Sequence, residues 1–466
     1  MKPQTSDSID VLNPATGAII ARSSDGGREA VDKAAQEAHV ALSGEWAAMS
    51  PALRAQILWR TGDSIEENLE SLAHEESTNC GMPLWLSRLL VLEAAKVFRY
   101  FAGSVERIAG QAKDVHANGG VFHAYTRREP LGVVGLITPW NVPFLITAMK
   151  VAPALAAGCT VLHKPAEETP LTALSLSRLL AEAGLPEGVF HVVTGYGHTT
   201  GAALVEHELV RKVSFTGSGA VGKSIVKAAA GNLKRVTLEL GGKSPVLICD
   251  DADVESAAAT AAIGIFGNSG QACVAGSRIY AQSKVYDEIV EKVASAAQSM
   301  RIGNGLEDDT VIGPLISQNQ LTRVLGFIEA GRNDGAEIVT GGKQIGDQGF
   351  YVEPTVLVNT RPDMSVVREE IFGPVVTIAK FDELDEAITQ ANDTEYGLSS
   401  SIWTRDIQVG HSAARQLQAG TVVINGSHVQ DMGMPFGGYK QSGWGRENGI
   451  EGLDAFLQSK SVYAAS

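Results

Sequence analysis

The sequence contains few cysteines and no long apolar run. Only four cysteines occur in 466 residues, and none forms a CxxC pair. A disulfide-framed secreted protein is therefore not expected, and neither is a metal site built on cysteine ligands. No run of about 18 apolar residues is present, and the opening MKPQTSD has no apolar stretch of signal-peptide type. These absences predict a soluble, cytoplasmic protein with no membrane contact.

Basic residues are in the minority. The chain has 38 Lys and Arg residues against 53 Asp and Glu residues, which gives a formal net charge of −15. This balance argues against binding to nucleic acid and to anionic membranes. Glycine is in excess, with 50 residues and no Gly-X-Y period. The excess is therefore expected in turns and loops rather than in a fibrous structure.

Short apolar segments alternate with helical segments after the first third of the chain. Four of them, at 133–137, 160–163, 190–193 and 213–215, are apolar without alternation, which is typical of parallel strands buried on both faces. A second series begins at 245–248. Because no Pro- or Ser-rich linker separates the two series, the sequence predicts two interlocked α/β domains.

Two helix starts are marked by capping residues. Ser50 stands before Pro51, as an N-cap stands before a proline at the first helical position. Asp253 is placed as an N-cap for a helix that runs through Ala262. Helices are therefore predicted to begin at 51 and at 254.

The segment Gly217–Gly222 has the pattern Gly-x-Gly-x-x-Gly between an apolar strand and a helical stretch. Backbone N–H groups in such a turn bind phosphate at a helix N-terminus. The alternative is a glycine-rich turn without a ligand. Glu239 lies 22 residues beyond Gly217, near the spacing of a ribose-binding acid in dinucleotide-binding folds. The apolar residues around Glu239 are also compatible with a second role, that of a general base.

Three residues have the chemistry of an acyl-transfer site. Cys273 lies among small residues in Gly270–Gly276, where it is either an inert packing residue or a nucleophile. Glu239 lies in an apolar strand that runs into two glycines, and burial there would raise its pKa toward that of a general base. Asn141, after Trp140, offers an amide donor for an oxyanion or serves only as a turn residue.

Seven motifs in fixed order resemble those of the aldehyde dehydrogenase superfamily, and the resemblance covers essentially the whole chain. They are Pro139-Trp140-Asn141, Lys164-Pro165-Ala166-Glu167, Phe215-Thr216-Gly217-Ser218, Leu238-Glu239-Leu240-Gly241-Gly242-Lys243, Gly270-Gln271-Ala272-Cys273, Glu370-Ile371-Phe372-Gly373-Pro374 and Pro435-Phe436-Gly437-Gly438. The resemblance implies NAD(P)-dependent oxidation of an aldehyde to a carboxylic acid through a thiohemiacetal and a thioester.

The resemblance also implies the catalytic roles. Cys273 would be the nucleophile, Glu239 the base, and Asn141 with the Cys273 backbone N–H the oxyanion hole. It thereby favours the active-site role of Glu239 over the ribose-binding one. No metal is implied.

Cofactor-binding residues follow from the same resemblance. The implied set is Lys164 and Glu167 for the adenosine ribose, Ser218 for the pyrophosphate, Glu370 for the nicotinamide ribose and Phe372 beside the nicotinamide, with Trp140 and Gly217 as further cofactor-binding residues. An acid at Glu167 repels a 2′-phosphate and accepts from hydroxyls, which favours NAD; NADP use stays open.

The implied substrate residues are apolar and include no arginine. They are Val142, Ile146, Met149, Ala272, Val274 and Phe436. This set predicts a neutral, medium-sized aliphatic or aromatic aldehyde, although each residue could equally be part of the core. Two alternatives remain for the function. They are a CoA-acylating relative, against which Glu239 argues, and a non-catalytic NAD-binding relative.

The implied fold is α/β, with a Rossmann-like cofactor domain, an α/β catalytic domain and a small β oligomerisation element. The expected boundaries are 1–110 and 131–241 for the cofactor domain, 242–442 for the catalytic domain, and 111–130 with 456–466 for the oligomerisation element. An exposed hairpin is an aggregation hazard unless another subunit covers it. A homodimer or homotetramer is therefore predicted.

Overall fold

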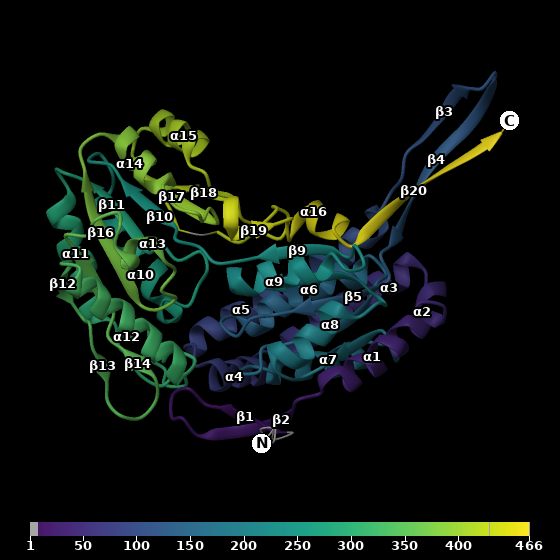
Figure 1. Ribbon diagram of the computed structural model, residues 1–466, viewed down its shortest axis with the longest axis horizontal. Helices are drawn as coiled ribbons and strands as arrows, with labels where there is room; N and C mark the ends of the chain where they lie inside the picture. The colour runs from purple at the N-terminus through teal and green to yellow at the C-terminus, as the bar shows by residue number, and fades with distance from the viewer. Residues whose placement is uncertain (1–7, 428, 466) are drawn as a thin grey trace.

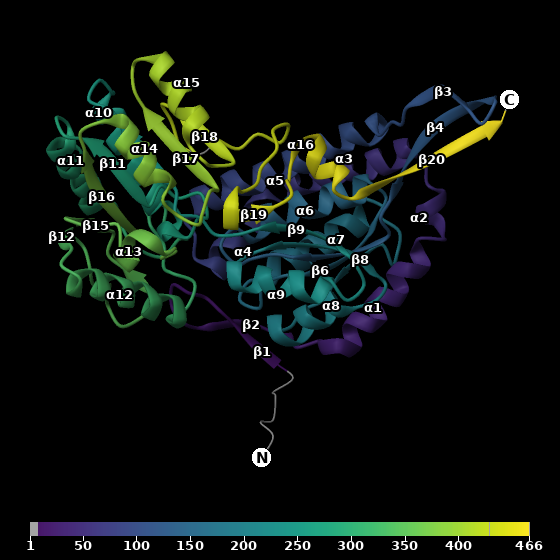
Figure 2. The ribbon, with the colours of Figure 1, turned by 45° about the horizontal axis from the view of Figure 1, so that its top comes forward.

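Two large β-sheets, each covered by helices on both faces, organise the chain in a computed structural model that describes residues 8–427 and 429–465 (Figure 1). A third, three-stranded sheet projects from one end of the molecule as an arm (Figure 2). The predicted α/β fold is confirmed.

The first sheet has six strands, and all but the edge strand β19 run parallel. Alternate residues of its central strand pack into different cores: Val134 and Leu136 on one face, Val133 and Ile137 on the other. This two-sided burial explains the unalternated apolar segments of the sequence. In sheet order the strands are β19 (Gly443–Trp444), β9 (Arg235–Glu239), β8 (Val210–Thr216), β5 (Val133–Ile137), β6 (Thr160–Lys164) and β7 (Phe190–Val192).

Helices on the two faces of this sheet belong to different cores. One face carries α1 (Gly27–Ala41), α8 (Ala202–Glu206) and α9 (Gly219–Ala229); the other carries α3 (Pro51–Glu67), α4 (Leu69–Cys80), α5 (Leu84–Ser104), α6 (Pro143–Ala156) and α7 (Leu171–Glu182). The predicted cap is present: the Leu53 N–H donates to Ser50 Oγ over 3.3 Å at the start of α3. Short elements complete this half, namely β1 (Ser8–Leu12), β2 (Ile19–Ser24), α2 (Glu45–Ala48) and α16 (Gly449–Asp454).

The second sheet has seven strands, with only β12 antiparallel to its neighbour. In sheet order they are β12 (Glu337–Thr340), β15 (Thr355–Val358), β16 (Val375–Phe381), β11 (Arg278–Gln282), β10 (Pro245–Ile248), β17 (Ser399–Trp403) and β18 (Thr421–Ile424). The surrounding helices are α10 (Val254–Phe266), α11 (Tyr286–Ser299), α12 (Gln318–Asn333), α13 (Ser365–Arg368), α14 (Leu384–Asn392) and α15 (Ile407–Gln416), with a small hairpin of β13 (Gln344–Ile345) and β14 (Tyr351–Val352). Asp253 caps α10 as predicted, accepting from Ser256 N–H over 3.1 Å.

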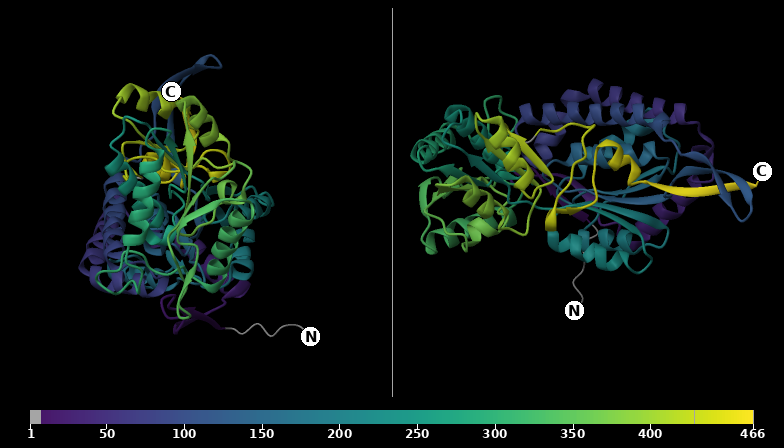
Figure 3. Two further views of the ribbon diagram at one scale, coloured as in Figure 1. Left: turned by 90° about the vertical axis from the view of Figure 1, so that its left-hand side faces the viewer. Right: turned by 90° about the horizontal axis from the view of Figure 1, so that it is seen from above.

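The arm consists of β3 (Ala112–Ala117), β4 (Gly120–Pro130) and β20 (Leu457–Ala465). Strand β20 pairs antiparallel with β4 over its whole length, so the end of the chain returns to a hairpin more than 300 residues earlier. Seen from above in Figure 3, the arm extends well beyond the helices of the first sheet. The predicted oligomerisation element thus has a structural counterpart, of which residue 466 lies outside the described part. Its role in assembly stays a prediction.

The two large sheets are interlocked by the end of the chain. After completing the second sheet at β18, the chain returns to the first and adds β19 beside β9. The predicted boundary at 442 falls immediately before this strand. Among the described helices, none is both long and apolar enough to cross a membrane.

Candidate active site

Strand ends from the first sheet and a loop from the second half meet where the two halves join. Glu239 ends β9, Lys164 ends β6, and Asn141 follows β5. Because the carboxyl ends of parallel strands open at one edge of a sheet, these side chains share that edge. The segment from Gly267 to Cys273 follows α10 and supplies the thiol.

The thiol of Cys273 is half-buried and lies near two acids. Burial raises the pKa of Cys273 to about 12, and the charges of Glu370 and Glu239 act in the same direction. A Cβ added at Gly242 would stand 2.4 Å from the Cys273 carbonyl oxygen. The glycine after Glu239's strand is therefore required for the nucleophile loop to approach so closely.

Glu239 is a buried carboxyl without a hydrogen-bond partner in the described part of the chain. Its burial is the main reason that its pKa is raised well above the ordinary value, and the Glu447 carboxylate adds to this effect. Lys150 and Arg446 act in the opposite direction. Because burial favours its protonated form, this carboxyl can exchange a proton with a thiol or a water molecule.

A buried polar cluster behind Glu239 was missed by the sequence analysis. Lys150 on α6 forms an ion pair with Glu447, and its Nζ donates to Ser214 Oγ over 3.0 Å. Ser214 in turn donates to Glu447 over 3.1 Å. The only sequence signal was a lysine inside the otherwise apolar stretch 143–156, since Glu447 lies 297 residues away from it.

Asn141 is buried and its amide is oriented by the nucleophile loop. Its Nδ2 donates to the backbone carbonyl of Gln271 over 2.8 Å, two residues before Cys273. That bond uses one of the two amide protons. The other is left to serve a second acceptor.

The residues predicted for the adenosine side lie on the first sheet. Lys164 is 2% exposed and its Nζ contacts Glu167 Oε2 at 3.1 Å, while the Glu167 side chain is 30% exposed. Ser218 caps α9 by accepting from Val221 N–H over 3.4 Å. Together with Gly217, it places the N-terminus of α9 at the site edge.

The residues predicted for the nicotinamide side, Glu370 and Phe372, come from the second half, and Phe372 meets Trp140 of the first half. The Gly242 N–H donates to Glu370 Oε1 over 2.9 Å. Burial raises the pKa of Glu370 to about 7, although that N–H and the Lys243 charge lower it. Phe372 has a positive φ of 59° and meets Trp140 edge-on, with ring centroids 5.3 Å apart. The structure thus brings Glu370, Phe372 and Trp140 to the junction.

The predicted substrate residues fall into two groups. Val142, Met149 and Phe436 pack against the core of the first half. Ile146 is half-buried on α6, the helix that also carries Met149. Ala272 packs against the core of the second half. Val274 lines a separate cavity of about 220 Å³ beside β10 and β17, which none of the other five lines in the described residues.

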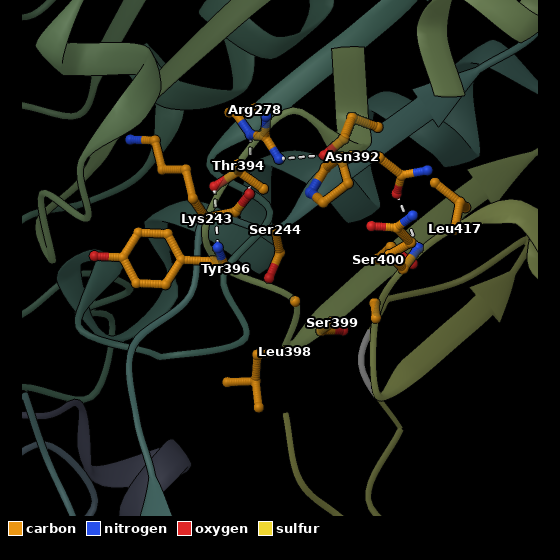
Figure 4. A pocket seen from close by; sticks show the side chains of 15 residues that line it. Lys243, Ser244, Arg278, Asn392, Thr394, Tyr396, Leu398, Ser399, Ser400 and Leu417 are labelled. Carbon is orange, nitrogen blue, oxygen red and sulfur yellow. Dashed lines mark hydrogen bonds between the residues drawn. The ribbon is translucent and has the colours of Figure 1, made fainter. Parts of the chain in front are cut away.

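A further cavity, drawn in Figure 4, is lined by residues that include Lys243, Ser244 and Arg278. Burial lowers the pKa of Lys243 to about 7 there, and the Arg278 charge adds to this effect. Arg278 donates to the carbonyls of Lys243 and Ala391, over 2.9 Å in each case. No predicted site residue lines this cavity in the described part of the chain. The described residues also contain no cluster of three or more His, Cys, Asp or Glu that could hold a metal ion.

Comparison with known proteins adds the family. The model of the aldehyde dehydrogenase family matches residues 1–462. The chain belongs to the aldehyde dehydrogenase family. This membership confirms the resemblance, the fold and the predicted enzyme class.

Relatives of this family member match along nearly their whole lengths. Mitochondrial aldehyde dehydrogenase of Rattus norvegicus is 44% identical, with 97% of this chain and 87% of the relative covered. Aldehyde dehydrogenase 1 of Tanacetum cinerariifolium is 44% identical, with 97% and 91% covered. The solved NAD+ complex of an aldehyde dehydrogenase from Bacillus cereus is 43% identical, covers 98% of this chain and 93% of its own, and superposes with a TM-score of 0.96.

Proposed function

We propose that this aldehyde dehydrogenase oxidises a neutral aldehyde to the carboxylic acid, with Cys273 as nucleophile and Glu239 as base. The observation that carries the proposal is the close approach at Gly242, which seats the Cys273 loop directly against the end of Glu239's strand. Burial raises the pKa of both the Cys273 thiol and the Glu239 carboxyl, the Glu239 charge acts on the thiol, and the Asn141 amide binds the backbone two residues before Cys273.

The first step is addition of the Cys273 sulfur to the carbonyl carbon. The thiol first gives its proton to solvent; the resulting thiolate forms a C–S bond with the carbonyl carbon, and the carbonyl π electrons move to oxygen. The free amide proton of Asn141 and the Cys273 backbone N–H are the donors for that oxyanion. Losing one such donor costs about 10²–10³ in rate.

Breakdown of the adduct is assigned to the same residues. As the C=O bond re-forms, the aldehyde C–H bond breaks and a thioester remains on Cys273. Glu239 then takes a proton from water, which attacks the thioester carbon, and the C–S bond breaks to release the acid and the thiolate. Lys150 and Glu447 form a buried ion pair, and the charges of both act on the pKa of Glu239.

The residues present fit a nicotinamide dinucleotide. The carboxylates of Glu167 and Glu370 can accept hydrogen bonds that ribose hydroxyls donate. The capped N-terminus of α9 suits a pyrophosphate. NAD bound there would supply the acceptor for the hydride, and the similar aldehyde dehydrogenase from Bacillus cereus has been solved as an NAD+ complex. Glu167 disfavours a 2′-phosphate, so NAD is the proposed cofactor and NADP the weaker one.

Two substitutions test the catalytic assignment. Cys273→Ala should abolish aldehyde-dependent NADH formation while NAD binding persists. Glu239→Gln should retain the first rapid formation of NADH but lower steady-state turnover by about 10²-fold or more, since a general base contributes that much. The acyl-enzyme should then be visible by intact-protein mass spectrometry.

The control is Cys249→Ala, which removes another buried cysteine, at the end of β10 and outside the site. It should turn over within about twofold of the parent, because it touches none of the reacting groups. Undiminished turnover of Cys273→Ala would refute the nucleophile. A parent enzyme that transfers the acyl group to CoA but not to water would favour the CoA-acylating alternative.

We also propose that the chain self-associates through its arm. Tyr463 is 62% exposed on β20 and Tyr125 is 38% exposed on the paired strand β4. Strand β20 lies at the edge of the three-stranded sheet, and β18 lies at the edge of the seven-stranded sheet. Exposed aromatic side chains on an edge strand are a hazard that a second subunit removes.

A further inference from the structure

Three side-chain amides around the nucleophile loop form a closed ring of hydrogen bonds. Asn141 Nδ2 donates to the Gln271 carbonyl over 2.8 Å. Gln271 Nε2 donates to the Asn268 carbonyl over 3.3 Å, and Asn268 Nδ2 donates back to the Asn141 carbonyl over 3.0 Å. All three side chains are buried, with 7% or less exposed. Each amide thus fixes the backbone of the next member.

The ring is tied to a distant part of the chain. Gln271 Oε1 accepts from Ile316 N–H over 2.9 Å, and its Nε2 also contacts the Pro314 carbonyl at 3.4 Å. Ser269 Oγ donates to the Gly313 carbonyl over 2.6 Å. The loop before Cys273 is therefore fastened to the segment 313–316 by two of its own side chains.

The backbone of this loop needs such support. Asn268, Ser269 and Gly270 are consecutive residues with positive φ, at 50°, 57° and 70°. A Cβ at Gly270 would stand 2.0 Å from the Gly373 carbonyl oxygen. Left-handed conformations in residues other than glycine persist only where the surroundings impose them. The amide ring and the bonds to 313–316 supply that constraint.

We propose that Asn268 and Gln271 are positioning residues that aim the oxyanion donor of Asn141. The ring consumes one Nδ2 proton of Asn141 and fixes the plane of its amide, so the second proton keeps one direction beside Cys273. This proposal rests on the proposed function of Asn141. Its physical basis is that an oxyanion donor acts only within about 2.7–3.1 Å of the oxygen it serves. A displacement near 1 Å costs about 10²-fold in rate.

Two variants break the ring at different places. Asn268→Gly removes one amide while keeping a residue that accepts positive φ. Gln271→Glu keeps the shape and the acceptor for Ile316 N–H, but it replaces the amide that donates to Asn268 and Pro314 by a second oxygen. Gln416→Glu is the matched control, because its exposed amide also donates to a backbone carbonyl, within α15.

Three measurements distinguish a misoriented Asn141 amide from a general loss of structure at the site. They are the single-turnover rate of NADH formation with propanal, the rate of Cys273 alkylation by iodoacetamide, and the dissociation constant of NAD. Alkylation forms no oxyanion, so it reports on the thiol alone. Both ring variants should lose about tenfold to hundredfold in the first rate. Alkylation and NAD affinity should stay within about threefold of the parent, and the control should match the parent in all three.

The Asn141→Ala background completes the test. Since Asn268 and Gln271 act through Asn141, adding either substitution there should cost less than about threefold more. Additive losses would overturn the proposal, as would ring variants with parental single-turnover rates, or alkylation that falls in parallel. Either ring variant, measured alone, is enough to support or overturn the proposal.

The same set of enzymes separates the two levels of inference. Full activity of Asn141→Ala by itself would refute the oxyanion role and with it this proposal. A slow Asn141→Ala enzyme beside fast ring variants would refute the positioning role only.

Discussion

The thiol of Cys273 is kept in its protonated form by its surroundings. Its pKa is raised to about 12 by burial and by Glu370 and Glu239, compared with about 8.5 for an exposed cysteine. The thiolate fraction therefore still rises with pH throughout the range from 7 to 10. In the protein without NAD, alkylation of Cys273 by iodoacetamide should accelerate about tenfold per pH unit without levelling off.

The measurement is the rate of modification of the Cys273 peptide by mass spectrometry. The same peptide in unfolded protein is the control, and its rate should level off near pH 9 as the exposed thiol ionises. A plateau below pH 9 in the folded protein would show that an unrecognised group stabilises the thiolate.

We propose that the single side chain of Glu167 sets the preference for NAD over NADP. It pairs with Lys164, which is almost completely buried. Glu167→Ser removes the charge that repels a 2′-phosphate and frees the ammonium to meet one. The ratio of kcat/KM for NADP to that for NAD should rise by about tenfold or more, the equivalent of about 1.4 kcal/mol.

Steady-state kinetics with both cofactors at one aldehyde concentration would measure this ratio. Glu187→Ser, at an exposed acid elsewhere on the first half, should leave it unchanged. An unchanged ratio in Glu167→Ser would remove Glu167 from the cofactor site.

At the scale of elements, one buried acid joins three helices. Glu76 on α4 accepts from the Phe144 N–H at the start of α6 over 2.9 Å and from Thr172 Oγ1 on α7 over 2.8 Å. Glu76→Ala leaves both donors unpaired in the core. The free energy of unfolding should fall by about 2–4 kcal/mol, because each orphaned buried donor costs about 1–3 kcal/mol.

Urea denaturation would measure this loss. Glu75→Ala removes a half-buried acid whose one partner is Ser175 Oγ at 2.7 Å, and it should cost about 1 kcal/mol or less. The pH dependence is a second readout. Burial raises the pKa of Glu76 to about 7, so the folded state holds the proton more tightly, and this carboxyl's contribution to stability falls as pH rises from 4.5 to 7. That dependence should be absent in Glu76→Ala.

Local signals in the sequence predicted elements well, and contacts across the fold could not be predicted. Ser50 and Asp253 mark helix starts because a cap and the N–H that it accepts are neighbours in the chain. The partners of Asn141 lie 127 and 130 residues away, and nothing around Asn268 or Gln271 indicates which carbonyl each amide meets. Such pairings exist only once both halves have packed.

Motif resemblance supplied part of what local patterns could not. It implied catalytic roles for Cys273, Glu239 and Asn141 in one active site without any structural information. It did not reveal Lys150 and Glu447, whose ion pair closes the site from behind. Nor did it reveal why Gly242 must be glycine, which depends on the Cys273 carbonyl 2.4 Å from the place of a Cβ.

At the scale of the whole molecule, the site depends on two halves staying in register. Asn141 of the first half donates to the Gln271 carbonyl of the second, and Trp140 of the first half meets Phe372 of the second. Strand β19 adds a third connection by returning to β9 after the second sheet is complete. A motion between the halves would therefore disturb the thiol, the base and the nicotinamide side together.

The arm offers the last prediction, since its aromatic side chains are exposed far from any core. If a second copy covers β20, the parent should sediment at two or four times the chain mass of 49.1 kDa at micromolar concentration. Tyr463→Glu puts a charge on a side chain that is 62% exposed in the single chain, and burying that charge in an interface is costly. The dissociation constant should rise by at least about tenfold, or about 1.4 kcal/mol, and monomer should appear on dilution.

Val40→Glu, at a residue 68% exposed on α1, is the matched control and should sediment as the parent does. A monomeric parent would refute self-association, and an assembly that Tyr463→Glu leaves intact would move the interface away from the arm, because only contact at the arm makes the assembly sensitive to a charge on β20.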